Sequence, residues 1–298
     1  MKAEKCLFEG LNALRLQFED TEMVVVYEKG PRIASYSRPG EENLLYWAPG
    51  KHGYEDWDLM GGHRVWACRE MADEAEETYR PDNRPCEVNI ADDAVVVKTP
   101  IDPVLKISRG LRIMPAGKGL GVCVENIIEN HGDFLYEAGV WSLTCSRPRP
   151  DTEYFIPVGD GSSWDSFSMV FFKTWGGHGQ DTFSDKQFRV EEEMLCLKPQ
   201  GLENKRMFQA QPGIISMLNP AEDTLFSKQM TWAPQARYPQ NCNAALYVGP
   251  DNFMVEMEFM GGVQLVKPGG MLCSREVWHI DAASAFDGTA ASLQRLCF

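Results

Sequence analysis

Short stretches in which apolar and polar residues alternate run through the whole chain, and turn residues bound most of them. Alternation with a period of two places successive side chains on opposite faces of a strand. Gly261-Gly262, which lies between two such stretches, indicates a hairpin. The pattern predicts strands at Glu22–Tyr27, Arg32–Ser37, Glu87–Lys98 (interrupted at Asp92-Asp93), Val104–Met114, Leu120–Asn130, Phe134–Cys145, Met169–Lys173, Gly213–Leu218, Ala244–Val248, Phe253–Met260, Val263–Lys267 and Leu272–Ile280.

Helical patterns are few by comparison. Trp66–Tyr79 is rich in Ala, Met and Glu, which suits a helix, and Thr289–Leu296 predicts a short helix capped by Thr289. Many strands without helical segments between them favour a sandwich or a barrel. Because no repeat and no long polar linker divides the chain, we predict an all-β protein: one large antiparallel β-sandwich domain over residues 1–298, with few short helices.

Composition narrows the classes of partner. Hydrophobic residues make up 44% of the 298 residues, which is enough for a sizeable core. The formal net charge of −14 argues against nucleic acid and anionic membranes, because binding to either requires concentrated positive charge. No stretch approaches the roughly 20 apolar residues of a membrane span, and the first residues lack a secretory signal. We therefore expect a soluble, cytoplasmic protein, with its oligomeric state left open.

The common motifs for nucleotide, zinc and calcium binding are missing. The sequence has no Walker or dinucleotide-binding glycine loop, no G-x-S-x-G elbow, no H-E-x-x-H and no EF-hand loop. Nine cysteines without a C-x-x-C pair favour reduced thiols. Five widely spread histidines indicate no dedicated metal site. We therefore expect neither a metal nor a cofactor.

The predicted strand Phe253–Met260 carries two glutamates on one face. Alternation places Glu256 and Glu258 side by side, roughly 6.5–7 Å apart along the strand. Two carboxylates held in this way suit the binding of a hydroxyl-rich ligand or the transfer of protons. The alternative is a half-buried strand whose outer face is wet, which is where charged side chains usually lie.

The segment Tyr46–Trp66 combines three Trp and two Tyr with histidine and arginine. Gly61-Gly62 lets the backbone bend sharply there and present His63 and Arg64. Flat aromatic faces beside hydrogen-bond donors suit a sugar, whose C–H faces stack on rings while its hydroxyls need polar partners. The alternative is that the tryptophans are core anchors and that Arg64 holds a structural carboxylate.

Two further segments carry candidate polar groups. His178 lies between glycines in a predicted loop, and Lys228, Arg237 and Tyr238 come together in a Pro-containing stretch. Lys228, Arg237 and Tyr238 could close a site for a negative or hydroxylated ligand. The alternative for His178 is plain surface exposure, and isolated Lys and Arg side chains are usually solvated.

Four stretches, in this order along the chain, resemble the galactose-mutarotase-like superfamily. Its large antiparallel β-sandwich includes the aldose 1-epimerases and sugar-binding relatives, so the resemblance implies this fold. Each motif is loose by itself, and their order carries the resemblance. The stretches are Val24–Ser35; Gly61–Trp66; Val124–Asp133 with Gly139–Thr144; and Phe253–Phe259 with Leu265–Gly270 and Glu276–Ile280.

The resemblance also implies a reaction. In aldose 1-epimerases a glutamate takes the proton from the anomeric hydroxyl while a histidine protonates the ring oxygen, so the sugar ring opens and closes to the other anomer. The matching motif makes Glu256 the general base, and Glu258 beside it would raise the pKa of one carboxyl by like-charge repulsion on a partly buried face. Trp141 stands where the epimerases place their histidine. His63 or His178 would then serve as the acid.

The residues and the resemblance support three hypotheses. The first is a carbohydrate-binding protein, either an aldose 1-epimerase or a related sugar-active enzyme. The second is a non-catalytic sugar-binding or regulatory module that uses the same cleft. The third is a β-sandwich without a sugar ligand, whose aromatic residues form core. Under the first hypothesis the catalytic residues are Glu256, His63 and His178, and the substrate-binding residues are Arg64, Trp66, Trp141, Lys228, Tyr238 and Glu258.

Overall fold

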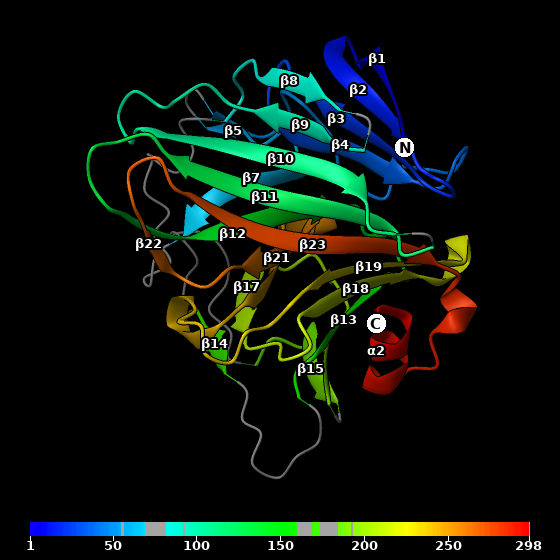
Figure 1. Cartoon of the computed structure of the whole chain (residues 1–298). Helices are drawn as coiled ribbons and strands as arrows, with labels where there is room; N and C mark the ends of the chain where they lie inside the picture. The colour runs from blue at the N-terminus through cyan, green and yellow to red at the C-terminus, as the bar shows by residue number, and fades with distance from the viewer. Residues whose placement is uncertain are drawn as a thin grey trace.

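The computed structural model describes residues 1–54, 57–68, 82–91, 93–117, 119–159, 168–172, 184–191 and 193–297. Within these residues two large antiparallel sheets lie face to face. Figure 1 shows β10 (Ile107–Pro115), β11 (Val122–Asn130) and β23 (Met271–Asp281) of one sheet in front of β7 (His63–Cys68) and β12 (Tyr136–Ser146) of the other. The prediction of an all-β antiparallel sandwich is confirmed.

The larger sheet has eleven strands among the described residues. Its middle is formed by β7, β12 and β21, and β22 (Gln264–Val266) adds to one end of β12. In spatial order the ten strands other than β22 are β1 (Lys2–Phe8), β2 (Leu11–Gln17), β3 (Glu22–Val26), β4 (Arg32–Ser37), β7 (His63–Cys68), β12 (Tyr136–Ser146), β21 (Val255–Met260), β20 (Ala244–Val248), β17 (Asn204–Phe208) and β14 (Met169–Phe171).

The second sheet has ten strands within the same described ranges. Its middle strands β19, β23 and β11 face the middle of the larger sheet. In spatial order the strands are β15 (Phe188–Glu191), β16 (Met194–Leu197), β13 (Glu153–Pro157), β18 (Ile214–Asn219), β19 (Thr224–Met230), β23 (Met271–Asp281), β11 (Val122–Asn130), β10 (Ile107–Pro115), β9 (Val95–Lys98) and β8 (Glu87–Ile90).

Smaller elements complete the described chain. A two-strand ribbon joins β5 (Gly53–Tyr54) and β6 (Trp57–Asp58), and 3₁₀ turns occupy Pro220–Glu222, Pro239–Asn241, Pro250–Asn252 and Ala283–Ala285. The helix α2 (Ala290–Cys297) lies beside β13 and β18 (Figure 1). No helix in the described ranges is long and apolar enough to cross a membrane.

Alternation along the strands divides the inward side chains from the outward ones. On β21, Val255, Met257 and Phe259 are fully buried in the core between the sheets. That core also takes Val124 from β11 and Trp278 from β23, both fully buried. The predicted faces of this strand are therefore confirmed, with the two glutamates on the opposite side.

Every predicted strand is present, and each starts and ends within a few residues of its predicted limits, with the interrupted range Glu87–Lys98 forming β8 and β9. The predictions at Arg32–Ser37 and Ala244–Val248 match β4 and β20 at both ends. The terminal helix is confirmed, and the Thr289 hydroxyl accepts a hydrogen bond from the Ser292 amide at 3.2 Å, as a cap does. The sequence pattern missed β1, β2, β5, β6, β7, β13, β15, β16, β17 and β19.

Two local predictions are wrong. The helix expected over Trp66–Tyr79 is contradicted at residues 66–68, which form the end of strand β7. The rest of that range, residues 69–79, lies outside the described residues. Gly261-Gly262 does not close a hairpin, because β21 and β22 both pair with β12 and not with each other. The Gly261 amide donates instead to the Val140 carbonyl at 2.7 Å, so the residue after β21 is still hydrogen-bonded to β12.

Candidate functional site

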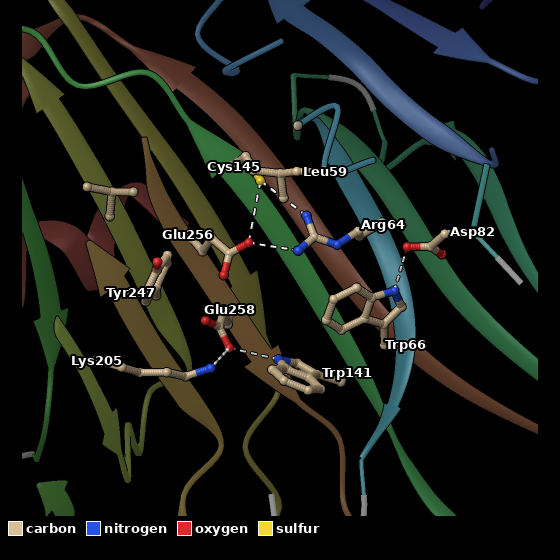
Figure 2. Close-up of polar contacts among 12 residues, drawn as sticks. Leu59, Arg64, Trp66, Asp82, Trp141, Cys145, Lys205, Tyr247, Glu256 and Glu258 are labelled. Atoms are coloured by element: carbon tan, nitrogen blue, oxygen red, sulfur yellow. Dashed lines mark hydrogen bonds and ion pairs between the residues drawn. The ribbon is translucent and has the colours of Figure 1, made fainter. Parts of the chain in front are cut away.

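The outer face of the larger sheet, which is the face turned away from the second sheet, gathers charged and aromatic side chains from its middle strands. Strand β7 contributes Arg64 and Trp66, β12 contributes Trp141, and β21 contributes Glu256 and Glu258 (Figure 2). The exposed fraction is 6% for Glu256 and 0% for Glu258. The alternative of a wet outer face therefore does not hold for these two carboxylates.

The turn before β7 sets the direction of Arg64. Gly61 and Gly62 have φ angles of +95° and +70°, which residues with a side chain rarely adopt. A Cβ on Gly62 would also lie 2.4 Å from the Ile33 carbonyl oxygen. The sharp bend predicted at these glycines is confirmed, and it leads directly into the strand that carries Arg64.

Arg64 and Glu256 form a buried ion pair. Arg64 Nη2 lies 2.8 Å from Glu256 Oε1, and Nη1 donates to Cys145 Sγ at 3.2 Å. The guanidinium also lies 4.4 Å from the centre of the Trp66 ring. Glu256 Oε2 has no hydrogen bond to any described residue and points away from the guanidinium (Figure 2). One oxygen of this carboxylate is thus fixed, and the other can receive a ligand.

Glu258 forms a second polar group beside the first. Its Oε2 accepts hydrogen bonds from Trp141 Nε1 at 2.8 Å and from Lys205 Nζ at 2.9 Å. Its Oε1 is buried and has no partner among the described residues. Burial raises the pKa of Glu258 to about 7; Lys205 opposes this shift, and the charge of Glu256 adds to it. The carboxyl with the raised pKa is that of Glu258, and burial, not the like-charge repulsion expected from the sequence, is the main cause.

Trp66 connects the outer face to a further charge cluster. Its Nε1 donates to Asp82 Oδ2 at 2.8 Å, and Trp57 Nε1 donates to the same oxygen at 3.4 Å. Arg32 and Arg109, both almost fully buried, lie 3.3 and 3.7 Å from the Asp82 carboxylate. Asp82 therefore fixes the edge of Trp66 and offsets buried positive charge.

His63 lies apart from these residues, which corrects the expectation that it shares their face. As the neighbour of Arg64 on β7, it points inward, and it is fully buried. Its Nδ1 lies 2.8 Å from the Thr144 hydroxyl, and its Nε2 lies 2.8 Å from Asn126 Oδ1 of the second sheet. Burial lowers its pKa to about 4. With both nitrogens bonded inside the core, His63 cannot face a ligand on the outer face.

Lys228 is also inside the sandwich, which corrects its expected role as a substrate-binding residue. It lies on β19 of the second sheet and is fully buried, with Nζ 3.1 Å from Glu276 Oε2. Nζ also donates to the Thr144 hydroxyl at 2.6 Å and to the Met257 carbonyl at 3.1 Å. Lys228 thus joins the two sheets through their interior.

Two other expected site residues are not part of the outer-face group. Tyr238 borders a separate cavity of about 660 Å³, together with Val140, Arg237 and Gly261, and the lining of this cavity includes neither glutamate. His178 lies outside the described residues. Of the residues predicted for the site, the structure brings together Arg64, Trp66, Trp141, Glu256 and Glu258.

Sequence reasoning missed three residues that complete the group: Asp82, Cys145 and Lys205. Lys205 lies on β17, two strands from Glu258, in a stretch without a recognisable pattern. For Cys145 a signal existed, because Trp141 and Cys145 are four positions apart on one predicted strand and so share a face.

Comparison with known proteins tests the fold. No family model matches the sequence, and no curated protein matches it. Among solved structures, a galactose mutarotase-like protein from Lactobacillus casei is 10% identical with a TM-score of 0.58, covering 90% of this chain and 99% of that one. A galactose mutarotase-like protein from Clostridium acetobutylicum is 9% identical with a TM-score of 0.60, covering 94% and 98%.

A third structure is that of a galactose mutarotase related enzyme from Lactobacillus acidophilus. It is 11% identical with a TM-score of 0.54, and the match covers 90% of this chain and 97% of that one. Identities this low carry the fold and not the activity. The chain has the fold of the galactose mutarotase-like proteins, as its sequence motifs predicted.

Proposed function

We propose that this chain binds an aldose on the outer face of its larger sheet, beside Arg64 and Glu256, and interconverts the two anomers of that sugar. The observation that carries the proposal is the Glu256 carboxylate, which Arg64 holds at 2.8 Å by one oxygen while the other oxygen stays free of described partners. A carboxylate fixed in this way is ready to accept a proton from a sugar hydroxyl.

The surroundings of Glu256 suit this role. Arg64 lies close to the face of Trp66 and cannot swing away without losing that contact, so the carboxylate is held in place. Arg64 also places a positive charge 2.8 Å from Glu256 Oε1. Glu256 would take the proton of the anomeric hydroxyl as the ring opens and return it to the carbonyl oxygen when the ring closes on the other face.

One observation favours a second candidate function, which is sugar binding without turnover. Trp141 occupies the position where the resemblance expects the catalytic histidine, and its Nε1 is bonded to Glu258. No described histidine forms a hydrogen bond with Glu256 or Glu258. The chain would then bind a sugar through Arg64 and Glu256 without interconverting its anomers.

Polarimetry and a binding assay separate the two functions. The wild-type protein is expected to speed the equilibration of freshly dissolved α-anomers from a panel of aldoses, and Glu256→Gln is expected to abolish this effect. Sugar-dependent tryptophan fluorescence measures binding in the same samples. Sugar binding without faster equilibration of the anomers supports the second function, a non-catalytic sugar-binding module. A panel that changes neither the optical rotation nor the fluorescence contradicts both functions.

A further inference from the structure

One of the two carboxylate oxygens of Glu258 is buried without a partner among the described residues. Its side chain is fully buried, and its Oε2 already accepts two hydrogen bonds, from Trp141 and from Lys205. Its Oε1 is equally buried but has no partner among the described residues. Leaving a buried carboxylate oxygen without a partner is unfavourable, so such an oxygen calls for a proton or a ligand.

The position of Glu258 relates it directly to Glu256. Both side chains project from the same face of β21, two residues apart, and therefore lie side by side (Figure 2). On a pyranose, the anomeric hydroxyl and the ring oxygen are bonded to the same carbon. Two neighbouring carboxyl groups on one strand are thus suitably spaced for one to reach each oxygen.

We propose that Glu258 is the general acid of this site: its Oε1 carries the proton that passes to the ring oxygen of the aldose, the part played by histidine in the epimerases. This inference rests on the proposed function and assigns the donor that the function lacks. Trp141 and Lys205 hold Oε2, so a proton on Glu258 resides on Oε1, where it can point to a ligand acceptor.

The proton balance of the step closes without any further reactant. Glu256 takes the proton from the anomeric hydroxyl, the O–H electron pair forms the C=O bond, and the bond from the anomeric carbon to the ring oxygen breaks. The electron pair of that bond stays on the ring oxygen, which takes the proton from Glu258. After rotation of the aldehyde the same transfers run in reverse, and both glutamates return to their starting states.

The environments of the two glutamates separate their tasks. Glu256 faces the guanidinium of Arg64, whereas Glu258 lies deeper, where burial raises its pKa to about 7. Two carboxyl groups in environments this different can divide into base and acid. Among the described residues, the charged or titratable groups that act on Glu258 include Lys205 on β17, Glu256 on β21, Cys68 on β7 and Lys228 from the second sheet.

Glu258→Gln is the decisive variant, because glutamine keeps the shape of the side chain and can donate a hydrogen bond but cannot transfer a proton. We expect kcat to fall by about 100-fold or more, while sugar affinity measured by fluorescence stays within threefold. The surface variant Glu137→Gln, which makes the same chemical change at an exposed position on β12, is the matched control. It should leave kcat unchanged.

The pH profile adds a readout that a purely structural role would not move. An acid must be protonated, so wild-type kcat should fall as pH rises through the pKa of Glu258. Lys205→Met removes a positive charge that lowers this pKa, and should therefore shift the fall to higher pH. An infrared band of a protonated carboxyl, present at pH 6 and lost at pH 9, should be absent from Glu258→Gln and requires no turnover.

The rival donor is His52, which stacks on Phe253 at 4.2 Å and whose Nε2 is buried without a described partner. His52→Gln should keep kcat within threefold. The inference is overturned if Glu258→Gln retains kcat within threefold, if His52→Gln alone abolishes turnover, or if the wild type binds aldoses without turning them over. A wild type that binds no aldose contradicts the proposed function instead, and the infrared band then still tests whether Glu258 holds a proton.

Discussion

Replacing Lys228 by methionine should destabilise the sandwich without removing a side chain from its outer face. Lys228 Nζ lies between the sheets, 3.1 Å from Glu276, and both side chains have no exposed surface. Methionine fills a similar volume but leaves the Glu276 charge without its cation. Asn126 and Trp278 still donate to Glu276, at 2.9 and 2.8 Å, so the carboxylate keeps hydrogen bonds but loses its counter-charge.

The expected loss is large for one substitution. Removing one partner of a buried ion pair costs about 3–5 kcal/mol. For a chain of 298 residues the entropy of unfolding is about 0.6 kcal/mol per kelvin, so the Tm should fall by about 5–8 °C. In the double variant Lys228→Met with Glu276→Gln the buried charge is gone, and at least half of the lost free energy should return.

Urea unfolding and thermal melting measure the effect. Lys2→Met is the matched control: its pair with Glu4 is exposed and 3.8 Å long, and its loss should cost less than about 1 kcal/mol. Sugar binding by Lys228→Met at 20 °C should equal that of the wild type. A free energy of unfolding within 1 kcal/mol of wild type, or a loss of sugar binding at full stability, would refute the placement of Lys228 as an interior ion pair.

Three other changes test separate parts of the structure. Arg64→Lys keeps the charge but cannot donate from a planar fork to Glu256 and Cys145 together, so kcat/KM for the aldose should fall by about 10- to 100-fold in the polarimetric assay. The folded protein holds a proton on Glu258 up to a pKa of about 7, against 4.5 in the unfolded chain, so stability should fall as pH rises between these values; melting curves should show a smaller fall for Glu258→Gln. Thr289→Ala removes the cap of α2 and should cost about 1 kcal/mol in urea unfolding, whereas Thr289→Ser should cost much less.

The strands that the sequence predicts best are those in which one face is buried and the other is not. Along β11, inward residues such as Val124 and Ile128 alternate with half-buried Glu125 and Glu129, and the pattern is plain in the sequence. Strand β7 lacks this contrast. Nearly every residue from His63 to Cys68 is buried, including a histidine and an arginine, so hydropathy gave no period of two.

The site was predictable where alternation alone decides it, as for Glu256 and Glu258. It was not predictable where strands distant in the sequence meet. Arg64 and Glu256 are 192 positions apart, and the partner of Glu258 on β17 comes from a run of buried residues with no pattern of its own. The sequence also did not predict that Glu258 is buried, and burial raises the pKa of this carboxyl to about 7.

The error over His63 follows from the same alternation, once its segment is known to be a strand. Neighbours on a strand face opposite ways, so His63 and Arg64 could not share a site. The inward set, with His63, Lys228 and Glu276, satisfies the polar atoms of these three side chains through contacts within and between the sheets. The outward set leaves Glu258 Oε1 buried and free of described partners. A ligand can supply the partner that this buried oxygen lacks, and this difference between the two faces is the strongest reason to look for the sugar beside Glu258.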